Sequence, residues 1–314
     1  MGEAYQYVSS YHTLPLNDKD LPAMQTVSVQ RYYSSESKDD TRARCKKERE
    51  ALWGALVKLK VELYSTTFYF PATDVLGKTE EPFYKNGYNR VFAGRGSPME
   101  IRDVLRLAIR AGRIGKGGVR PTLDAYVYDF MTLDCNGFMG NLFNLSPHMH
   151  IANWATGDGT KSDDYYDDIG WLEADKMTKG YLPLKPILSV GDITPCDVII
   201  TVKRNVMLSM GRFVHIAVVD GISPAGNGKH YVQVVEWGGH GADKHYAPDT
   251  FEIIDGPELP GIGKKKDGTP KNGKKLGVGF WEKGKEQENI FRYFFKKPCQ
   301  ANPATWGRFG LEDV

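Results

Sequence analysis

A cysteine at the start of an expected helix is the residue of this chain that is best placed for covalent chemistry. Cys135 follows Asp134, and an apolar set with the spacing of one helix face continues after it: Phe138, Met139, Leu142 and Phe143. The pattern predicts a helix that begins at Cys135. The positive end of a helix dipole and its unpaired N–H groups stabilise a thiolate, which is the nucleophilic form of sulfur.

A histidine with a nearby carboxylate follows about eighty residues later. His215 stands at the entrance of an apolar stretch, residues 212–221, which predicts a buried strand. After a turn at 223–229, residues 230–237 predict its hairpin partner, which carries Glu236. A nucleophile, a base and a group that orients the base are the parts of a cysteine hydrolase, and they come here in a usable order. Glu236 is the first choice for the orienting group, and the alternatives are His240, Gln233 and Asp220.

Three motifs support this interpretation. Residues 134–138 read Asp-Cys-Asn-Gly-Phe, residues 195–200 read Pro-Cys-Asp-Val-Ile-Ile, and residues 215–221 read His-Ile-Ala-Val-Val-Asp-Gly. In this order they resemble the Asp-Cys-Ser-Gly-Phe, Pro-Gly-Asp-Leu-Val-Phe and His-Val-Gly-Ile-Tyr-x-Gly motifs of the NlpC/p60-type cell-wall peptidases and the related CHAP amidases. Asn136 stands where the family has serine, and Cys196 stands where it has glycine. Neither difference removes a catalytic group.

The resemblance implies a fold and a set of site residues. The expected fold is α+β and papain-like, with the helix of the catalytic cysteine packed on an antiparallel β-sheet. Cys135, His215 and Glu236 are the expected catalytic residues, with His240 as the alternative third residue. The backbone N–H of Cys135 would hold the oxyanion. Further oxyanion or substrate contacts are expected from residues close to these in sequence: Tyr126, Tyr128, Asp134 and Trp237.

The remaining elements suggest an appended region ahead of a hydrolase domain. Residues 1–95 are expected to contain an irregular arm up to about residue 40, a helix over 39–63 and a short strand over 64–70. Residues 96–314 form the expected hydrolase domain, with insertions at about 145–190 and 240–285. Within it, Ser97 and Glu100 form a capping box for a helix over 99–111 that ends at Gly112. Strands are expected over 193–203, 213–220, 230–237 and 290–295.

The composition excludes several other classes of protein. The 314 residues carry a formal net charge of +2, which gives no reason to expect nucleic-acid binding. The four cysteines are widely separated and argue against a disulfide framework. No run of about twenty apolar residues and no signal peptide is visible, so we expect no membrane span and synthesis in the cytoplasm. A specialised secretion route or release by lysis would then bring the protein to its substrate.

Two weaker motifs predict no cofactor. Residues 115–118 (Gly-Lys-Gly-Gly) lack the ending of a phosphate-binding loop and follow no strand. His148 and His150 could ligate a metal, but they lack a third ligand at a defined spacing, so an ordinary loop is expected. A lysine-rich stretch over 261–275 predicts a solvated loop, with contact to an anionic polymer as the alternative.

These observations together predict a cysteine-dependent amide hydrolase. The expected substrate is the stem peptide of peptidoglycan or its amide linkage to sugar, cleaved by an exported toxin or a phage lysin. An immunity or delivery protein is a candidate partner. Two alternatives stay open. The same cysteine and histidine could catalyse deamidation or acyl transfer at a protein glutamine, or the domain could be a non-catalytic module that binds cell wall.

Overall fold

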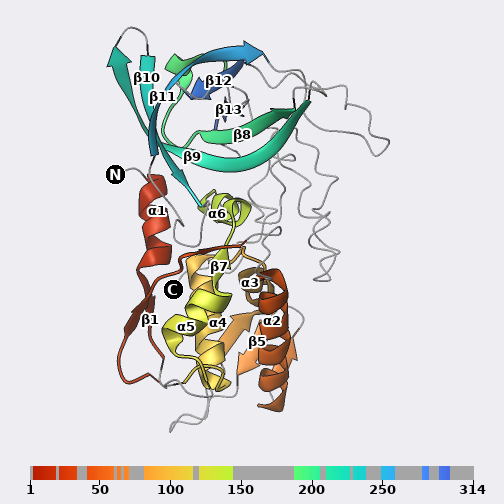
Figure 1. Ribbon diagram of the computed structural model, residues 1–314. Coiled ribbons are helices and arrows are strands. Elements are labelled where there is room, and N and C mark those ends of the chain that lie inside the picture. The colour runs from red at the N-terminus through yellow and green to blue at the C-terminus, as the bar shows by residue number, and fades with distance from the viewer. Residues whose placement is uncertain are drawn as a thin grey trace. The chain divides into compact units, whose positions relative to one another are not determined.

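The structure is a computed structural model of residues 1–314 (Figure 1). It describes residues 3–18, 21–33, 41–59, 62–64, 67–70, 81–115, 120–143, 187–205, 210–226, 229–237, 249–258, 278–282 and 290–297. The contacts divide the chain into two units. The barrel unit contains Met1–Val8, Leu142–Gly238 and Tyr246–Thr305. The helical unit contains Ser9–Asn141, Gly239–His245 and Trp306–Val314. Helices and mostly antiparallel sheets occur together, as the α+β prediction states.

Six strands form the closed barrel of the barrel unit. They are β8 (Val198–Asn205), β9 (Met210–Gly226), β10 (Lys229–Glu236), β11 (Asp249–Glu258), β12 (Val278–Glu282) and β13 (Ile290–Phe295). All neighbours are antiparallel in the order β10-β11-β12-β13-β8-β9, which closes through β9 and β10 (Figure 1). The side chains of one buried apolar cluster come from these strands and from the segment before β8: Ile187, Ile193, Ile199, Ala217, Val219, Val232, Val234, Phe280 and Phe294.

The barrel confirms four predicted strands and changes three details. Strand β8 begins at Val198, after the turn at Pro195, and strands β9 and β10 continue to Gly226 and from Lys229, into the expected turn. The stretch 240–285, expected to be an insertion, contributes β11 and β12 to the barrel. Most of the other expected insertion, 145–186, lies outside the described residues, as do residues 261–275.

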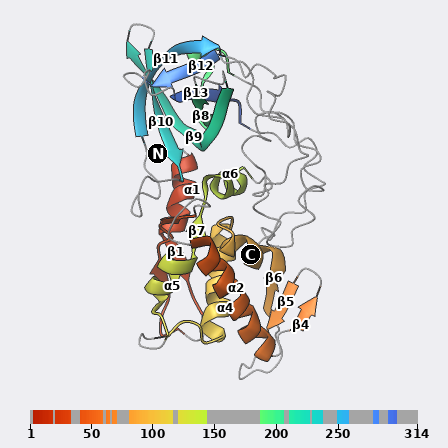
Figure 2. The same cartoon turned by 45° about the vertical axis from the view of Figure 1, so that its right-hand side comes forward.

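The helical unit contains short sheets and most of the helices. Strands β1 (Leu14–Leu16) and β2 (Gln25–Val27) pair with each other, and β3 (Arg31–Tyr32) pairs in parallel with β7 (Thr132–Leu133). Strands β4 (Glu62–Tyr64), β5 (Thr67–Phe70) and β6 (Glu81–Tyr84) form a three-stranded sheet (Figure 2). The helices are α2 (Thr41–Lys58), α3 (Lys85–Phe92), α4 (Pro98–Arg110) and α5 (Leu123–Phe130), and α6 begins at Cys135 and ends at Leu142.

Helix α4 forms as its sequence predicts. Pro98 occupies its first turn, the Ser97 hydroxyl accepts the Glu100 N–H, and the Glu100 carboxylate accepts the Ser97 N–H at 2.9 Å. These two bonds are the predicted capping box. The chain leaves the helix through Gly112, whose φ of +66° suits glycine.

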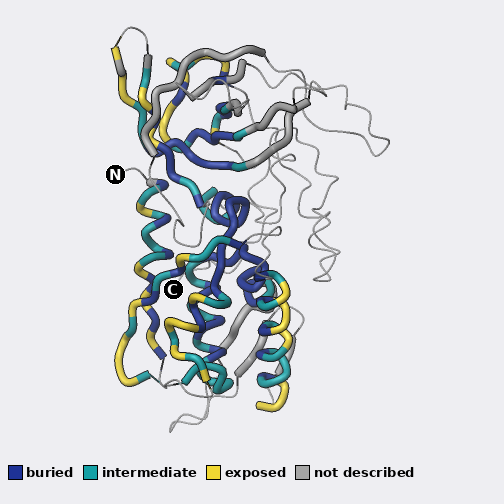
Figure 3. Tube along the Cα trace, in the orientation of Figure 1, coloured by how far each residue is buried: buried dark blue, intermediate teal, exposed yellow. Residues whose placement is uncertain are grey.

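The N-terminal elements differ from the sequence prediction. The irregular arm expected before residue 40 contains a helix, α1 (Glu3–His12), because Ala4, Val8 and Tyr11 recur at helical spacing and are fully buried. Helix α2 confirms the expected helix but ends at Lys58. Leu52 and Leu56 are buried as expected, whereas the side of α2 that carries Val57 is exposed (Figure 3).

Among the described residues, none of the helices combines the length and the apolar composition needed to cross a membrane.

Candidate active site

Cys135 is the first residue of α6, as the sequence predicts. Strand β7 ends at Leu133, and Asp134 then begins the helix by accepting the Phe138 N–H on its carbonyl oxygen. The carboxylate of Asp134 also accepts the Gly137 N–H at 2.6 Å, which is the bond of a helix cap. Cys135 is only 5 % exposed. The local sequence therefore places the thiol at the end of the helix where a thiolate is stabilised.

Arg95 is the ionic partner of Asp134. Its Nε lies 2.7 Å from Asp134 Oδ2, and both side chains are almost fully buried. Each carboxylate oxygen of Asp134 thus has a described partner, one in Arg95 and one in Gly137. The described contacts of Asp134 are those of a residue that holds the helix start. Its predicted role as an oxyanion or substrate contact stays a prediction.

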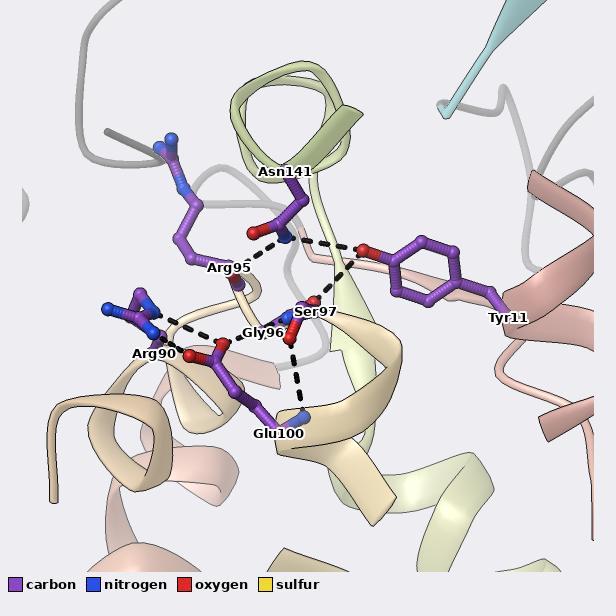
Figure 4. A network of polar contacts seen from close by, with 7 residues as sticks. All are labelled: Tyr11, Arg90, Arg95, Gly96, Ser97, Glu100 and Asn141. Carbon is purple, nitrogen blue, oxygen red and sulfur yellow. Dashed lines mark hydrogen bonds and ion pairs between the residues drawn. The ribbon is translucent and has the colours of Figure 1, made fainter. Parts of the chain in front are cut away.

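The turn between α3 and α4 forms a platform for α6. The Asp134 N–H donates to the Gly94 carbonyl at 2.9 Å, and the Asn141 amide donates to the Arg95 carbonyl at 3.1 Å. Tyr11 connects the same parts, because its hydroxyl lies within hydrogen-bonding distance of both Asn141 and the Gly96 carbonyl (Figure 4). Below the turn, Glu100 pairs with the buried Arg90 (Figure 4).

Close packing against this platform requires a glycine in α6. A Cβ atom on Gly137 would lie 2.5 Å from the Gly94 carbonyl oxygen and 2.8 Å from the Arg95 Cα. Both are backbone atoms, so they cannot rotate away as the end of a side chain can. Gly94 itself has a φ of +70°, in the left-handed region that favours glycine. The glycine of the Asp-Cys-Asn-Gly-Phe motif therefore has a packing role.

Tyr32 is the tyrosine beside the cysteine. Its hydroxyl lies 3.8 Å from the Cys135 sulfur, within donor distance for a thiol acceptor. The parallel pairing of β3 with β7 brings Tyr32 there, since Tyr32 lies opposite Leu133. The negative charge of a Cys135 thiolate, followed by burial, raises the pKa of Tyr32 well above its ordinary value. Tyr32 therefore stays a neutral hydroxyl donor when the thiolate forms.

The two tyrosines that the sequence suggested have other contacts. The Tyr126 hydroxyl is buried and donates to Glu48 at 3.0 Å, and burial raises its pKa. Tyr128 is 47 % exposed, with the Arg31 guanidinium over its ring. The structure brings neither hydroxyl to Cys135 in its described contacts, and a role for them at the oxyanion stays a prediction.

His215 and Glu236 meet in the barrel unit. Glu236 lies opposite Ala217 across the β9–β10 pair, so His215, two residues before Ala217, is its diagonal neighbour. Ala217 and Val234 belong to the buried apolar cluster, and residues two apart on a regular strand share a face. His215 and Glu236 therefore share that face, and His215 Nε2 lies 3.0 Å from Glu236 Oε2. The predicted base and its first-choice orienting carboxylate are in contact.

The contact places a carboxylate beside the imidazole ring of His215. When the ring takes up a proton, the charged imidazolium remains beside Glu236, which stabilises it. Half-burial of the pair, with side chains 19 % and 30 % exposed, strengthens that attraction relative to open water.

The other candidates for the orienting group are placed differently. Asp220 accepts the Tyr5 N–H at 3.0 Å, at the point where β9 bulges against β10. Gln233 is exposed, whereas its neighbours Val232 and Val234 are buried. His240 lies outside the described residues. Trp237, next to Glu236, is fully buried.

Comparison with known proteins assigns the chain to no family. The chain matches no family model, no curated protein and no solved structure. The assignment of the site thus depends on the residues themselves. Cys135 belongs to the helical unit, whereas His215 and Glu236 belong to the barrel unit, and each group is described within its own unit.

The other two described cysteines, Cys45 and Cys196, have surroundings that suit a structural role. Cys45 is fully buried, and burial raises the pKa of its thiol to about 12, so it is a poor nucleophile. Cys196 lies in the turn before β8 with a φ of +69°. Cys299, His148 and His150 lie outside the described residues. In the described part of the chain, no three potential ligands of the His, Cys, Asp or Glu type gather as a metal site would require.

Sequence reasoning missed two residues beside Cys135. Tyr32 is 103 positions away and carries no local signal, because only the pairing of β3 with β7 brings it there. Arg95 did have a signal, since it is a charged residue between two glycines just before a helix cap. A buried carboxylate such as Asp134 requires a partner of opposite charge, and Arg95 supplies it.

Proposed function

We propose that this protein is a cysteine-dependent amide hydrolase in which Cys135 is the nucleophile, His215 the base and Glu236 the group that orients the base. The contact that carries the proposal is His215 Nε2 to Glu236 Oε2 at 3.0 Å. It supports the predicted choice of Glu236 as the group beside the His215 ring. The second observation that supports the proposal is the position of Cys135 at the start of α6.

The chemistry follows from these groups once the thiol and the imidazole meet. The Cys135 proton passes to His215 Nδ1, and the thiolate attacks the carbonyl carbon of the amide. The negative oxygen of the tetrahedral intermediate accepts a bond from the Cys135 backbone N–H and from the Tyr32 hydroxyl. His215 then protonates the leaving amine as the C–N bond breaks, and a thioester remains.

Water completes the cycle. His215 takes a proton from the water as it attacks the thioester carbonyl, and the C–S bond breaks to release the carboxylic acid. The proton returns to the sulfur. Glu236 stays ionised throughout and holds the ring in one tautomer. The proposal includes a papain-like relation between the helix of Cys135 and the sheet of His215, as the motifs suggest.

The proposed substrate is peptidoglycan, either a stem peptide or its amide linkage to sugar. The motif resemblance supports this choice. Delivery as an exported toxin or a phage lysin is part of the proposal. A deamidase and a binding module are the alternative functions, and the muropeptide experiment distinguishes them from the proposed one.

Mass spectrometry of purified muropeptides tests the proposal. Wild-type protein should release a product that gains one water, Cys135→Ala should release none, and Cys196→Ala should match the wild type as a thiol control. Unchanged muropeptides would contradict the substrate assignment. Cys135-dependent ammonia release from a protein glutamine would then move the function to deamidation, and a Cys135 thiol inert towards iodoacetamide would favour a binding module.

A further inference from the structure

We propose that Arg95 is a positioning residue for Cys135: by neutralising Asp134, it lets this carboxylate cap α6 without opposing the formation of a thiolate on the next residue. The inference deepens the proposed function and rests on it, since it assumes that Cys135 works as a thiolate. It adds a charged residue from the turn between α3 and α4 to the machinery of the nucleophile.

Among the described contacts of Asp134, the ionic partner is Arg95. Arg95 Nε approaches Asp134 Oδ2 at 2.7 Å, while Oδ1 accepts the Gly137 N–H at 2.6 Å. Arg95 is 1 % exposed and Asp134 is 7 % exposed. A charge buried to this degree is stable only when it is paired, so each residue depends on the other.

The backbone of Arg95 fixes its position relative to α6. The Arg95 carbonyl accepts the Asn141 amide from the last turn of α6 (Figure 4). The Arg95 Cα lies close to Gly137. The neighbouring Gly94 carbonyl accepts the Asp134 N–H. Arg95 therefore contacts both ends of α6, through its side chain at Asp134, just before the first residue, and through its carbonyl at the last turn.

A positive charge is needed here because Asp134 lies directly before Cys135 in the sequence. A carboxylate next to a thiol opposes ionisation of the thiol, because two negative charges repel more strongly where water is excluded. The charged and titratable side chains around this part of the helical unit include Tyr32 from β3, Tyr33 after it, Arg42 and Cys45 from α2, Asp134 and Arg95. Arg95 is the cation among them that contacts Asp134.

The inference predicts opposite effects for the two partners. Arg95→Met removes the cation that contacts Asp134 beside Cys135, so the pH midpoint of thiol alkylation should rise. Asp134→Asn keeps a capping side chain and removes the negative charge next to the thiol, so the midpoint should fall. A shift of one pH unit corresponds to about a tenfold change in alkylation rate below the midpoint.

The test is the rate of iodoacetamide alkylation at Cys135 from pH 5 to 9 in the full chain, read by mass spectrometry of the peptide that carries it. At pH 6, Arg95→Met should react about tenfold more slowly than the wild type and Asp134→Asn should react faster. Arg95→Met combined with Asp134→Asn should restore the wild-type midpoint, because both charges are gone. Arg95→Lys should also keep that midpoint.

Shifts in the same direction for the two single variants, or no recovery in the double variant, would overturn the inference. Circular dichroism shows which variants fold. If Arg95→Met does not fold, Asp134→Asn and Arg95→Lys decide, and a wild-type profile in Asp134→Asn would refute the claim. A profile that responds to Arg95 and Asp134 but not to His215→Ala would keep this inference while removing the proposed function.

Discussion

Tyr32 stands out among the side chains near Cys135, because its hydroxyl proton is retained under conditions in which the thiol is ionised. Tyr32→Phe removes only that hydroxyl. If Tyr32 supports the oxyanion, we expect kcat on muropeptides to fall about a hundredfold, with little change in KM. The matched control is Tyr128→Phe, which removes an exposed hydroxyl from the same unit. Equal losses in both variants would argue against a role for Tyr32.

Glu236 should be less costly to lose than the groups that react. Glu236→Gln keeps the shape of the side chain but removes the charge that stabilises the His215 imidazolium, so a small residual turnover should remain. Cys135→Ala and His215→Ala should abolish turnover. The comparison with His240→Ala is decisive. Near-wild-type turnover in Glu236→Gln, with a large loss in His240→Ala, would move the orienting role to His240.

Cys135, His215 and Glu236 could be nominated from the sequence because local patterns carry them. A helix start, two alternating strands and a hairpin turn are all short-range signals. The same reasoning chose Tyr126 and Tyr128 because they precede Cys135 closely in sequence. Tyr32 approaches the sulfur through pairing between β3 and β7, and no local pattern encodes a parallel pair of two-residue strands.

Helix α6 depends on a close approach to the turn between α3 and α4. Gly137→Ala would place a methyl group against backbone atoms of Gly94 and Arg95, so we expect it to lower the free energy of unfolding by about 1–3 kcal/mol. Gly54→Ala in α2 is the control, because a Cβ there meets nothing within 4 Å and removes the helix penalty of glycine. It should raise that free energy by about 0.5–1 kcal/mol. Denaturant unfolding measures both, and a neutral Gly137→Ala would refute the packing role.

The turn before β8 has a geometry at Cys196 that favours glycine. Asp197 N–H donates to the Thr194 carbonyl at 3.1 Å, Pro195 precedes Cys196, and Cys196 has a φ of +69°. These are the features of a type II turn, whose third position favours glycine. The Asp197 carboxylate also anchors the turn, by accepting the Thr194 N–H at 2.7 Å and pairing with Lys296 at 3.0 Å.

Cys196→Gly should therefore stabilise the protein. The left-handed conformation costs a non-glycine residue about 1–2 kcal/mol, and the greater freedom of glycine in the unfolded chain offsets part of the gain. We expect an increase of about 0.5–1 kcal/mol in the free energy of unfolding. Cys196→Ala removes the same thiol but keeps a Cβ, so it should give no such increase. Equal effects of the two variants would exclude backbone strain as the cause.

By contacts, the whole chain divides into two units that each combine segments distant in sequence. The catalytic motifs suggested a boundary near residue 95, and that functional division stays a prediction. By contacts, the helical unit combines residues before and after that point, since β3 pairs with β7 and Tyr11 bonds to Gly96 and Asn141. Such pairings bring together residues far apart in sequence, which periodicity cannot reveal. The barrel strands, by contrast, alternate clearly and were largely predictable.

The central claim is that the Cys135 thiol and the His215 imidazole work as one group, and thiol reactivity tests it without a known substrate. The measurement is the pH dependence of iodoacetamide alkylation at Cys135 in the wild type and in His215→Ala, with the buried Cys45 as an internal reference. An imidazolium beside the sulfur favours the thiolate, so the wild type should react at pH 6 at least about tenfold faster than His215→Ala. Superimposable profiles, or faster alkylation of Cys45 than of Cys135, would contradict the account.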